Sequence, residues 1–163
     1  MLCIAIDLGH GAISVATSAH QQALDEHLEH RGIDVSAARA PGQYVSFDAE
    51  ETLAMISIDG VPDEERFFAM LRDIVERLCL RHDRVLIFGE LVALLWAEGR
   101  LAAAIRVEKW WNELISARPV LLYCAYPNEA ARDPAHSAAF REVCLEYCKV
   151  LESNGVDLLL GSR

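Results

Sequence analysis

Two glutamates, Glu90 and Glu108, are the side chains whose positions most suggest chemistry. Glu90 follows the apolar run 85–88 and Gly89, so we predict a carboxylate at the carboxyl end of a buried strand. Open α/β sheets build their ligand sites at this edge. Glu108 interrupts the apolar stripe of a helix predicted over 101–117. A buried carboxylate is costly unless it is paired, so we expect Glu108 to meet an arginine, a backbone N–H group or a ligand.

Histidines and cysteines form two further candidate clusters, and each has a plainer interpretation. His20, His27 and His30 lie seven and three residues apart on a predicted helix and could bind a metal. Their polar neighbours instead favour a solvated helix face. Cys144 and Cys148 lie four apart and could ligate a metal, or be two buried thiols. The buried interpretation is favoured because no CxxC or CxxH partner accompanies them.

A glycine-containing segment at 9–11 could let backbone N–H groups approach a phosphate. It lacks the lysine and hydroxyl of a phosphate loop, and a strand is predicted after it, so a simple turn is favoured. We therefore predict that ATP and GTP do not bind.

Alternating helices and apolar strands predict an α/β domain with a mainly parallel sheet flanked by helices. Residues 1–8 are either a short strand or the tail of a helix, and 34–43 is a connector. Thr17 or Ser18, Asp48 and Asp63 are predicted helix caps. The predicted strands cover 12–17, 44–47, 84–88 and 119–126, with an edge strand or tail at 156–160. The predicted helices cover 18–31, 48–58, 63–81, 91–97, 101–117 and 133–151.

Composition limits the class of protein. The 163 residues are one domain of ordinary size, and 53% are hydrophobic, which excludes a disordered chain. The net charge of -10 disfavours direct nucleic-acid binding. No apolar run approaches the ~20 residues of a membrane span, and no signal peptide is visible, so we expect a cytoplasmic location. The five cysteines are expected to be free thiols, because the cytoplasm keeps thiols reduced.

Several of these segments together resemble one family closely. FGELVALLWAEGRLAAAIRVEKWWNEL, then LLYCAYP, with the upstream RGIDV, GQYVSFDAEETL and DGVPDEERF, are similar to the MEDS domain (methanogen/methylotroph, DcmR sensory domain). The resemblance runs from about Ala5 to Leu151. It implies a three-layer RecA/KaiC-like fold whose nucleotide-binding motifs are lost. The matching family residues are Gly89, Glu90, Trp96, Gly99, Glu108, Trp111, Asn112, Cys124, Tyr126 and Pro127.

Two departures from the family pattern concern the beginning of the domain. The usual first strand and helix, with a His…Phe-Tyr motif, are absent, and His10 stands where the family usually has Glu. The resemblance makes residues 1–8 the end of that helix. We expect the sheet edge left open to be covered by a partner or a second copy.

The resemblance implies a non-catalytic sensory domain for small hydrocarbon derivatives, acting in signalling or transcription regulation. We expect one ligand pocket, with no metal or cofactor, and core packing is the alternative for each of its aromatic residues. Its predicted lining is Glu90, Trp96, Glu108, Trp111, Asn112 and Tyr126. The alternatives are a protein-interaction module that binds a kinase or sigma-factor regulator, and a residual ATPase or hydrolase. The enzyme alternative is disfavoured because the sequence lacks a phosphate loop and a nucleophile arrangement.

Overall fold

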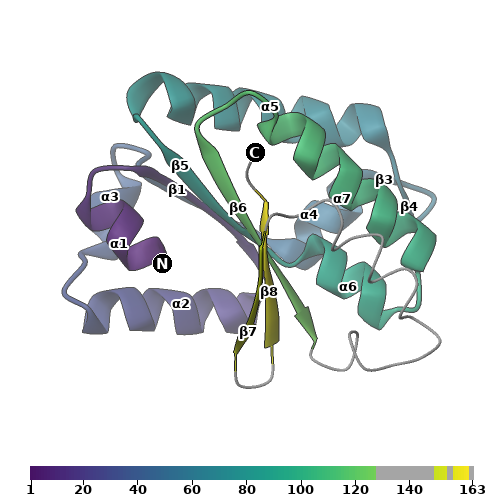
Figure 1. Cartoon of the computed structure of the whole chain (residues 1–163), viewed down its shortest axis with the longest axis horizontal. Helices are drawn as coiled ribbons and strands as arrows, with labels where there is room; N and C mark the ends of the chain where they lie inside the picture. Colours follow the sequence, from purple (N-terminus) through teal and green to yellow (C-terminus); the bar gives the residue numbers. More distant parts are fainter. Residues whose placement is uncertain (128–148, 154–155, 162–163) are drawn as a thin grey trace.

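The computed structural model describes residues 1–127, 149–153 and 156–161, with side chains through residue 124. It is organised around one sheet whose strands lie in the order β2-β1-β5-β6-β8-β7 (Figure 1). Strands β2, β1, β5 and β6 pair in parallel, and β8 and β7 extend the sheet as antiparallel strands. Their bounds are β1 Gly11–Ala16, β2 Tyr44–Asp48, β5 Val85–Gly89, β6 Val120–Pro127, β7 Lys149–Ser153 and β8 Val156–Gly161.

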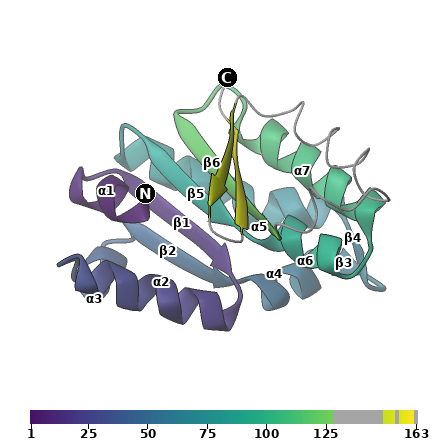
Figure 2. The same cartoon turned by 60° about the horizontal axis from the view of Figure 1, so that its bottom comes forward.

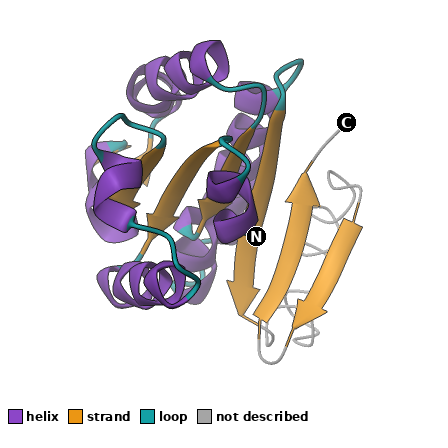
Figure 3. Ribbon diagram, turned by 90° about the vertical axis from the view of Figure 1, so that its left-hand side faces the viewer, coloured by secondary structure: helices purple, strands orange, loops and turns teal. Residues whose placement is uncertain are grey.

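Helices cover both faces of the parallel strands, which gives the three layers predicted from the sequence (Figures 2 and 3). Strand side chains alternate between the two faces. Ile13 and Ile87 therefore pack with one group of helices, and Ala12 and Leu86 pack with the other. The first group is α4 (Ala49–Met55), α5 (Glu64–Arg81), α6 (Leu91–Ala97) and α7 (Leu101–Ile115). The second group is α1 (Leu2–Asp7), α2 (Ser18–His30) and α3 (Val35–Arg39).

The strand order places a topological switch point between β1 and β5. After β1 the chain forms β2 on one side, and it later returns to form β5 on the other side of β1. In doubly wound sheets the crevice at the carboxyl ends of two such strands is the usual ligand site. The residues that follow β1 and β5 therefore decide what this edge can bind.

Two of the three predicted helix caps are confirmed. The Asp48 carboxylate accepts hydrogen bonds from the backbone N–H groups of Glu50 and Glu51, each at 2.9 Å, and Asp63 caps α5 in the same way. The third, at the start of α2, is confirmed in its position only. Thr17 occupies the cap position without a side-chain hydrogen bond, and the Ser18 hydroxyl donates instead to Asp48 Oδ2 at 2.6 Å.

Short elements account for most other differences from the expected boundaries. Residues 2–7 form a helix, as the family resemblance implied, and the predicted connector contains α3, which Asp34 caps. The helix expected over 48–58 ends at Met55, because a hairpin of β3 (Ser57–Ile58) and β4 (Val61–Pro62) follows it. Its turn residues Asp59 and Gly60 both have positive φ, which suits a two-residue hairpin loop.

The C-terminal part of the sequence prediction is partly wrong and partly outside the described residues. The helix predicted over 133–151 is wrong at 149–151, where the chain is part of β7. The rest of that helix, with Cys144 and Cys148, lies outside the described residues. The possible edge strand at 156–160 forms β8 and pairs with β6 on one side and β7 on the other. In the described part of the chain, no helix is both long and apolar enough to cross a membrane.

Candidate functional site

Glu90 lies at the switch point and links the end of β5 to the start of α2. Its Oε2 accepts a hydrogen bond from the backbone N–H of Thr17 at 2.9 Å, and its Oε1 lies 2.7 Å from Nδ1 of His20. The Glu90 side chain is 8% exposed, whereas His20 is 66% exposed. His20 is therefore solvated, as expected from its polar neighbours, but its ring also has a specific carboxylate partner. Neither Arg84 nor Arg106 pairs with Glu90 in the described part of the chain.

This arrangement uses a backbone donor that could otherwise bind an anion. The first N–H groups after a strand of an α/β sheet, where the next helix begins, are common phosphate donors. Here the Glu90 carboxylate takes the Thr17 N–H. A phosphate at the same place would meet a buried negative charge and lose this donor. The Glu90 carboxylate therefore disfavours an anion at the Thr17 N–H.

The glycine segment at 9–11 is a turn, as predicted, at the opposite end of β1. Gly9 has φ +75 and its carbonyl oxygen lies 2.7 Å from Nδ1 of His82. Gly11 begins β1, and a side chain there would press against Leu78, His82 and Val85. The segment thus connects α1 to the sheet.

Glu108 lies on α7, one of the helices that pack on the Ile13 and Ile87 face of the sheet. It is 1% exposed on α7, and the Cys124 thiol donates a long hydrogen bond to its Oε1 at 3.6 Å. Burial, together with the negative charge of Glu108, raises the pKa of Cys124 well above its usual value. The cysteine is therefore a neutral thiol that donates to the carboxylate. The buried carboxylate expected from the helix pattern is confirmed.

The aromatic and amide residues of the predicted pocket also lie on the α7 side or beyond the described side chains. Trp96 and Trp111 belong to the core there, and the Trp111 ring packs edge-on against Phe67 at 5.1 Å between centroids. Asn112 Nδ2 is buried with no hydrogen bond within the described residues. Tyr126 lies in β6, and its side chain is not among those described. Glu108 meets Cys124, whose neighbour across the β5–β6 pair is Gly89, so both glutamates lie near the carboxyl ends of β5 and β6. A single pocket lined by the six residues named from the sequence stays a prediction.

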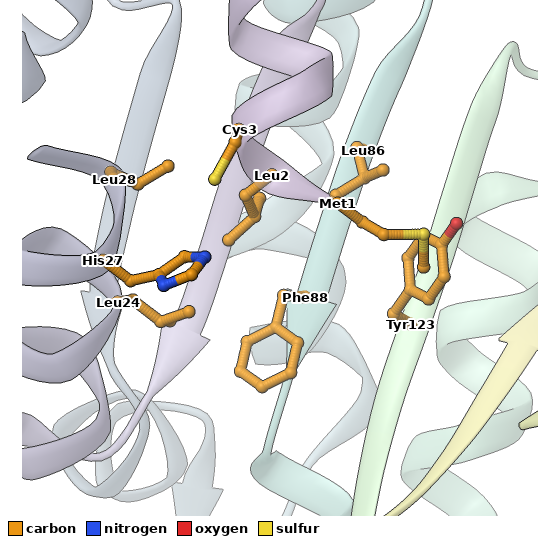
Figure 4. Close-up of a pocket in the computed structure, with 9 residues that line it drawn as sticks. All are labelled: Met1, Leu2, Cys3, Leu24, His27, Leu28, Leu86, Phe88 and Tyr123. Atoms are coloured by element: carbon orange, nitrogen blue, oxygen red, sulfur yellow. The ribbon is translucent and has the colours of Figure 1, made fainter. Parts of the chain in front are cut away.

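A different pocket, of about 190 Å³, lies between α1 and α2 over β5 and β6 (Figure 4). Most of the side chains that line it are apolar, and the others are the imidazole of His27, the thiol of Cys3 and the phenol of Tyr123. The full lining is Met1, Leu2, Cys3, Leu24, His27, Leu28, Leu86, Phe88 and Tyr123. None of these residues belongs to the ligand pocket predicted from the sequence. The available signal was the alternation along β5 and β6, which puts Leu86, Phe88 and Tyr123 on one face.

A buried polar network holds α2, one wall of this pocket, against the sheet. The Ser14 and Tyr44 hydroxyl oxygens lie 2.9 Å apart, and the Gln21 amide donates to the Tyr44 oxygen at 2.7 Å. Asp25 accepts from Arg39 at 2.7 Å, and this pair links α2 to α3. Burial raises the pKa of Tyr44 and keeps its hydroxyl neutral. With Glu90 at its start, α2 is held by polar contacts over its first two turns.

The histidines of α2 do not form a metal site with other described residues. Over the described residues, no group of three or more His, Cys, Asp and Glu side chains is placed to hold a metal ion. The rings of His20 and His30 have other partners, Glu90 and the carbonyl oxygen of Glu26.

Comparison with known proteins identifies one family. The family model described as MEDS, the MEthanogen/methylotroph, DcmR Sensory domain, matches residues 5–143. No curated protein and no solved structure matches the chain.

Proposed function

Because this chain belongs to the MEDS family of sensory domains, we propose that it is a non-catalytic sensor that binds a small hydrocarbon derivative in the pocket between α1 and α2. The output we propose is signalling or transcription regulation. The observation that supports the binding step is an apolar pocket of molecular size next to the helix that Glu90 anchors.

The size and lining of the pocket suit a small apolar ligand. An apolar cavity of about 150 Å³ is enough to hold benzene, and this pocket is about 190 Å³. Leucine, methionine and phenylalanine side chains would exchange contact with water for contact with the ligand. Each Å² of apolar surface removed from water contributes about 25 cal/mol. A ligand of about ten heavy atoms would therefore bind mainly by the hydrophobic effect.

In this proposal Glu90 acts by positioning. It holds the first turn of α2, and α2 contributes Leu24, His27 and Leu28 to the pocket wall. Direct ligand contact by the other residues predicted from the sequence stays a prediction; these are Trp96, Glu108, Trp111, Asn112 and Tyr126. A contact by Trp111 is the least supported, because this side chain is 0% exposed.

The test is binding of ethylbenzene, measured by isothermal titration calorimetry. Trp96, Trp110 and Trp111 are poor reporters because they pack on the opposite side of the sheet. We expect binding by the native chain, loss of binding in Leu24→Trp, which fills the pocket, and retention in Ala23→Trp. Ala23 is the matched control because it is exposed on the same helix and does not line the pocket. Absence of ethylbenzene binding, or equal binding by both variants, would contradict the proposal.

A second candidate function is protein interaction, including self-association. Strand β2 is at the edge of the sheet, with no strand paired to its outer side within the described residues. Unpaired strand edges are sites at which another chain can add a strand. We propose a second copy or a regulatory protein as the partner at this edge.

A further inference from the structure

Building on the proposed pocket, we infer that its ligand is a neutral molecule with one hydroxyl group, and that His27 is the residue that selects this group. The inference concerns the chemical class of the ligand. It depends on which polar atoms face the pocket and which of them already have partners.

The side chains that line the pocket offer no carboxylate to a ligand. The lining contains no aspartate, glutamate, lysine or arginine. Burial raises the pKa of Tyr123, so its phenol stays neutral. An ammonium group entering the pocket would lose hydration without meeting a counter-charge. Cationic ligands are therefore disfavoured.

His27 differs from the other two histidines of α2 in the hydrogen bonding of its ring. His20 is engaged by Glu90 at 2.7 Å, and Nδ1 of His30 lies 2.7 Å from the carbonyl oxygen of Glu26. His27 is exposed like the other two and lines the pocket, but its ring makes no hydrogen bond or ion pair within the described residues. Figure 4 shows it extending from α2 toward Leu2, across the pocket from Tyr123.

The hydrogen-bonding capacity of the His27 imidazole determines which polar group of a ligand can pair with it. A neutral imidazole has one N–H donor and one acceptor nitrogen. A hydroxyl group can also donate or accept, so it can pair with the imidazole in either tautomer. An alcohol or phenol would satisfy this ring and place its hydrocarbon part against Phe88 and Leu86.

An isosteric series tests the inference. Ethylbenzene, benzyl alcohol and benzylamine have the same size and end in a methyl, a hydroxyl and an ammonium group. Their affinities would be measured by calorimetry for the native chain, for His27→Leu and for the control His30→Leu. His30 is exposed on the same helix and does not line the pocket.

We expect the ratio of benzyl alcohol affinity to ethylbenzene affinity to fall about fivefold in His27→Leu and to stay unchanged in His30→Leu. Benzylamine should bind at least about tenfold more weakly than benzyl alcohol. His27→Phe, which keeps a ring at this position, should behave like His27→Leu. In the native chain, benzyl alcohol should also shift the His27 ring resonances in NMR spectra in a way that ethylbenzene does not.

The outcomes separate the two proposals. If ethylbenzene binds in the pocket but neither substitution at His27 changes the affinity ratio, the sensory pocket stands and this inference is overturned. Benzylamine binding as tightly as benzyl alcohol also overturns it. If no member of the series binds, the proposed function fails and the inference fails with it.

Discussion

Removal of the Glu90 carboxylate should destabilise the protein by breaking the connection between β5 and α2. Glu90→Ala leaves the backbone N–H of Thr17 without its acceptor and removes the partner of His20. A hydrogen bond to a charged group contributes about 1.5–3 kcal/mol, and an exposed ion pair adds less than about 1 kcal/mol. Since His20 is largely exposed, the backbone hydrogen bond is the larger contribution. We expect Glu90→Ala to lower the free energy of unfolding by about 2–3 kcal/mol.

Two further variants measure how much of this free energy comes from each contact of Glu90; they are Glu90→Gln and His20→Ala. Glutamine keeps one acceptor oxygen but presents an amide donor to the other partner, so about 1–2 kcal/mol should be lost. His20→Ala should cost less than about 1 kcal/mol.

Urea and thermal unfolding measure these differences. A loss of about 2–3 kcal/mol in a domain of this size corresponds to a midpoint roughly 5–10 °C lower. Glu98→Ala is the control, because Glu98 is an exposed acid at the other end of α6 and should stay within about 0.5 kcal/mol of the native chain. The reasoning is refuted if Glu90→Ala is as stable as this control, or more stable than the native chain. Either result would mean that Glu90 is not held for structural reasons and would favour direct ligand contact.

Four further results are expected. Calorimetry should detect no magnesium-dependent ATP binding, and micromolar affinity would revive the enzyme alternative. Cys124 should resist iodoacetamide at pH 8 in the folded protein, since burial and Glu108 raise its pKa, and peptide mapping that shows rapid labelling would contradict this. The hydrogen bond from Ser18 is the main cause that lowers the pKa of Asp48 below 3.8. In Ser18→Ala that pKa, followed by NMR, should rise toward 3.8. The stability that the native chain gains from this shift is present above pH 3.8 and is lost as the pH falls through the lowered pKa, so the stability difference from Ser18→Ala should shrink there. Light scattering should show self-association that Ser46→Pro in the edge strand weakens, because in the register of β2 the Ser46 N–H points away from β1, and a monomer at high concentration would count against it.

The local order of elements was available from the sequence because it depends on short-range chemistry. The apolar period changes between 2 and 3.6 along the chain, and this pattern predicted four parallel strands and the longer helices. Asp48 and Asp63 cap helices because their carboxylates reach backbone N–H groups two or three residues away. The burial of Glu108 followed from its place in an apolar stripe, since a helix presents residues three and four apart on one face.

Tertiary structure alone decided which side chains meet. The sequence placed Glu90 at the end of a strand, but the partner of its carboxylate depends on which helix starts beside that strand, and the strand order determines this. Glu90 contacts Thr17 and His20 at the start of α2, whereas Glu108 contacts Cys124 in β6. The pocket takes residues from α1, α2, β5 and β6, which are as far apart as Met1 and Tyr123. Periodicity reports which residues share a face of one element, and only the packing of elements against each other determines what that face encloses.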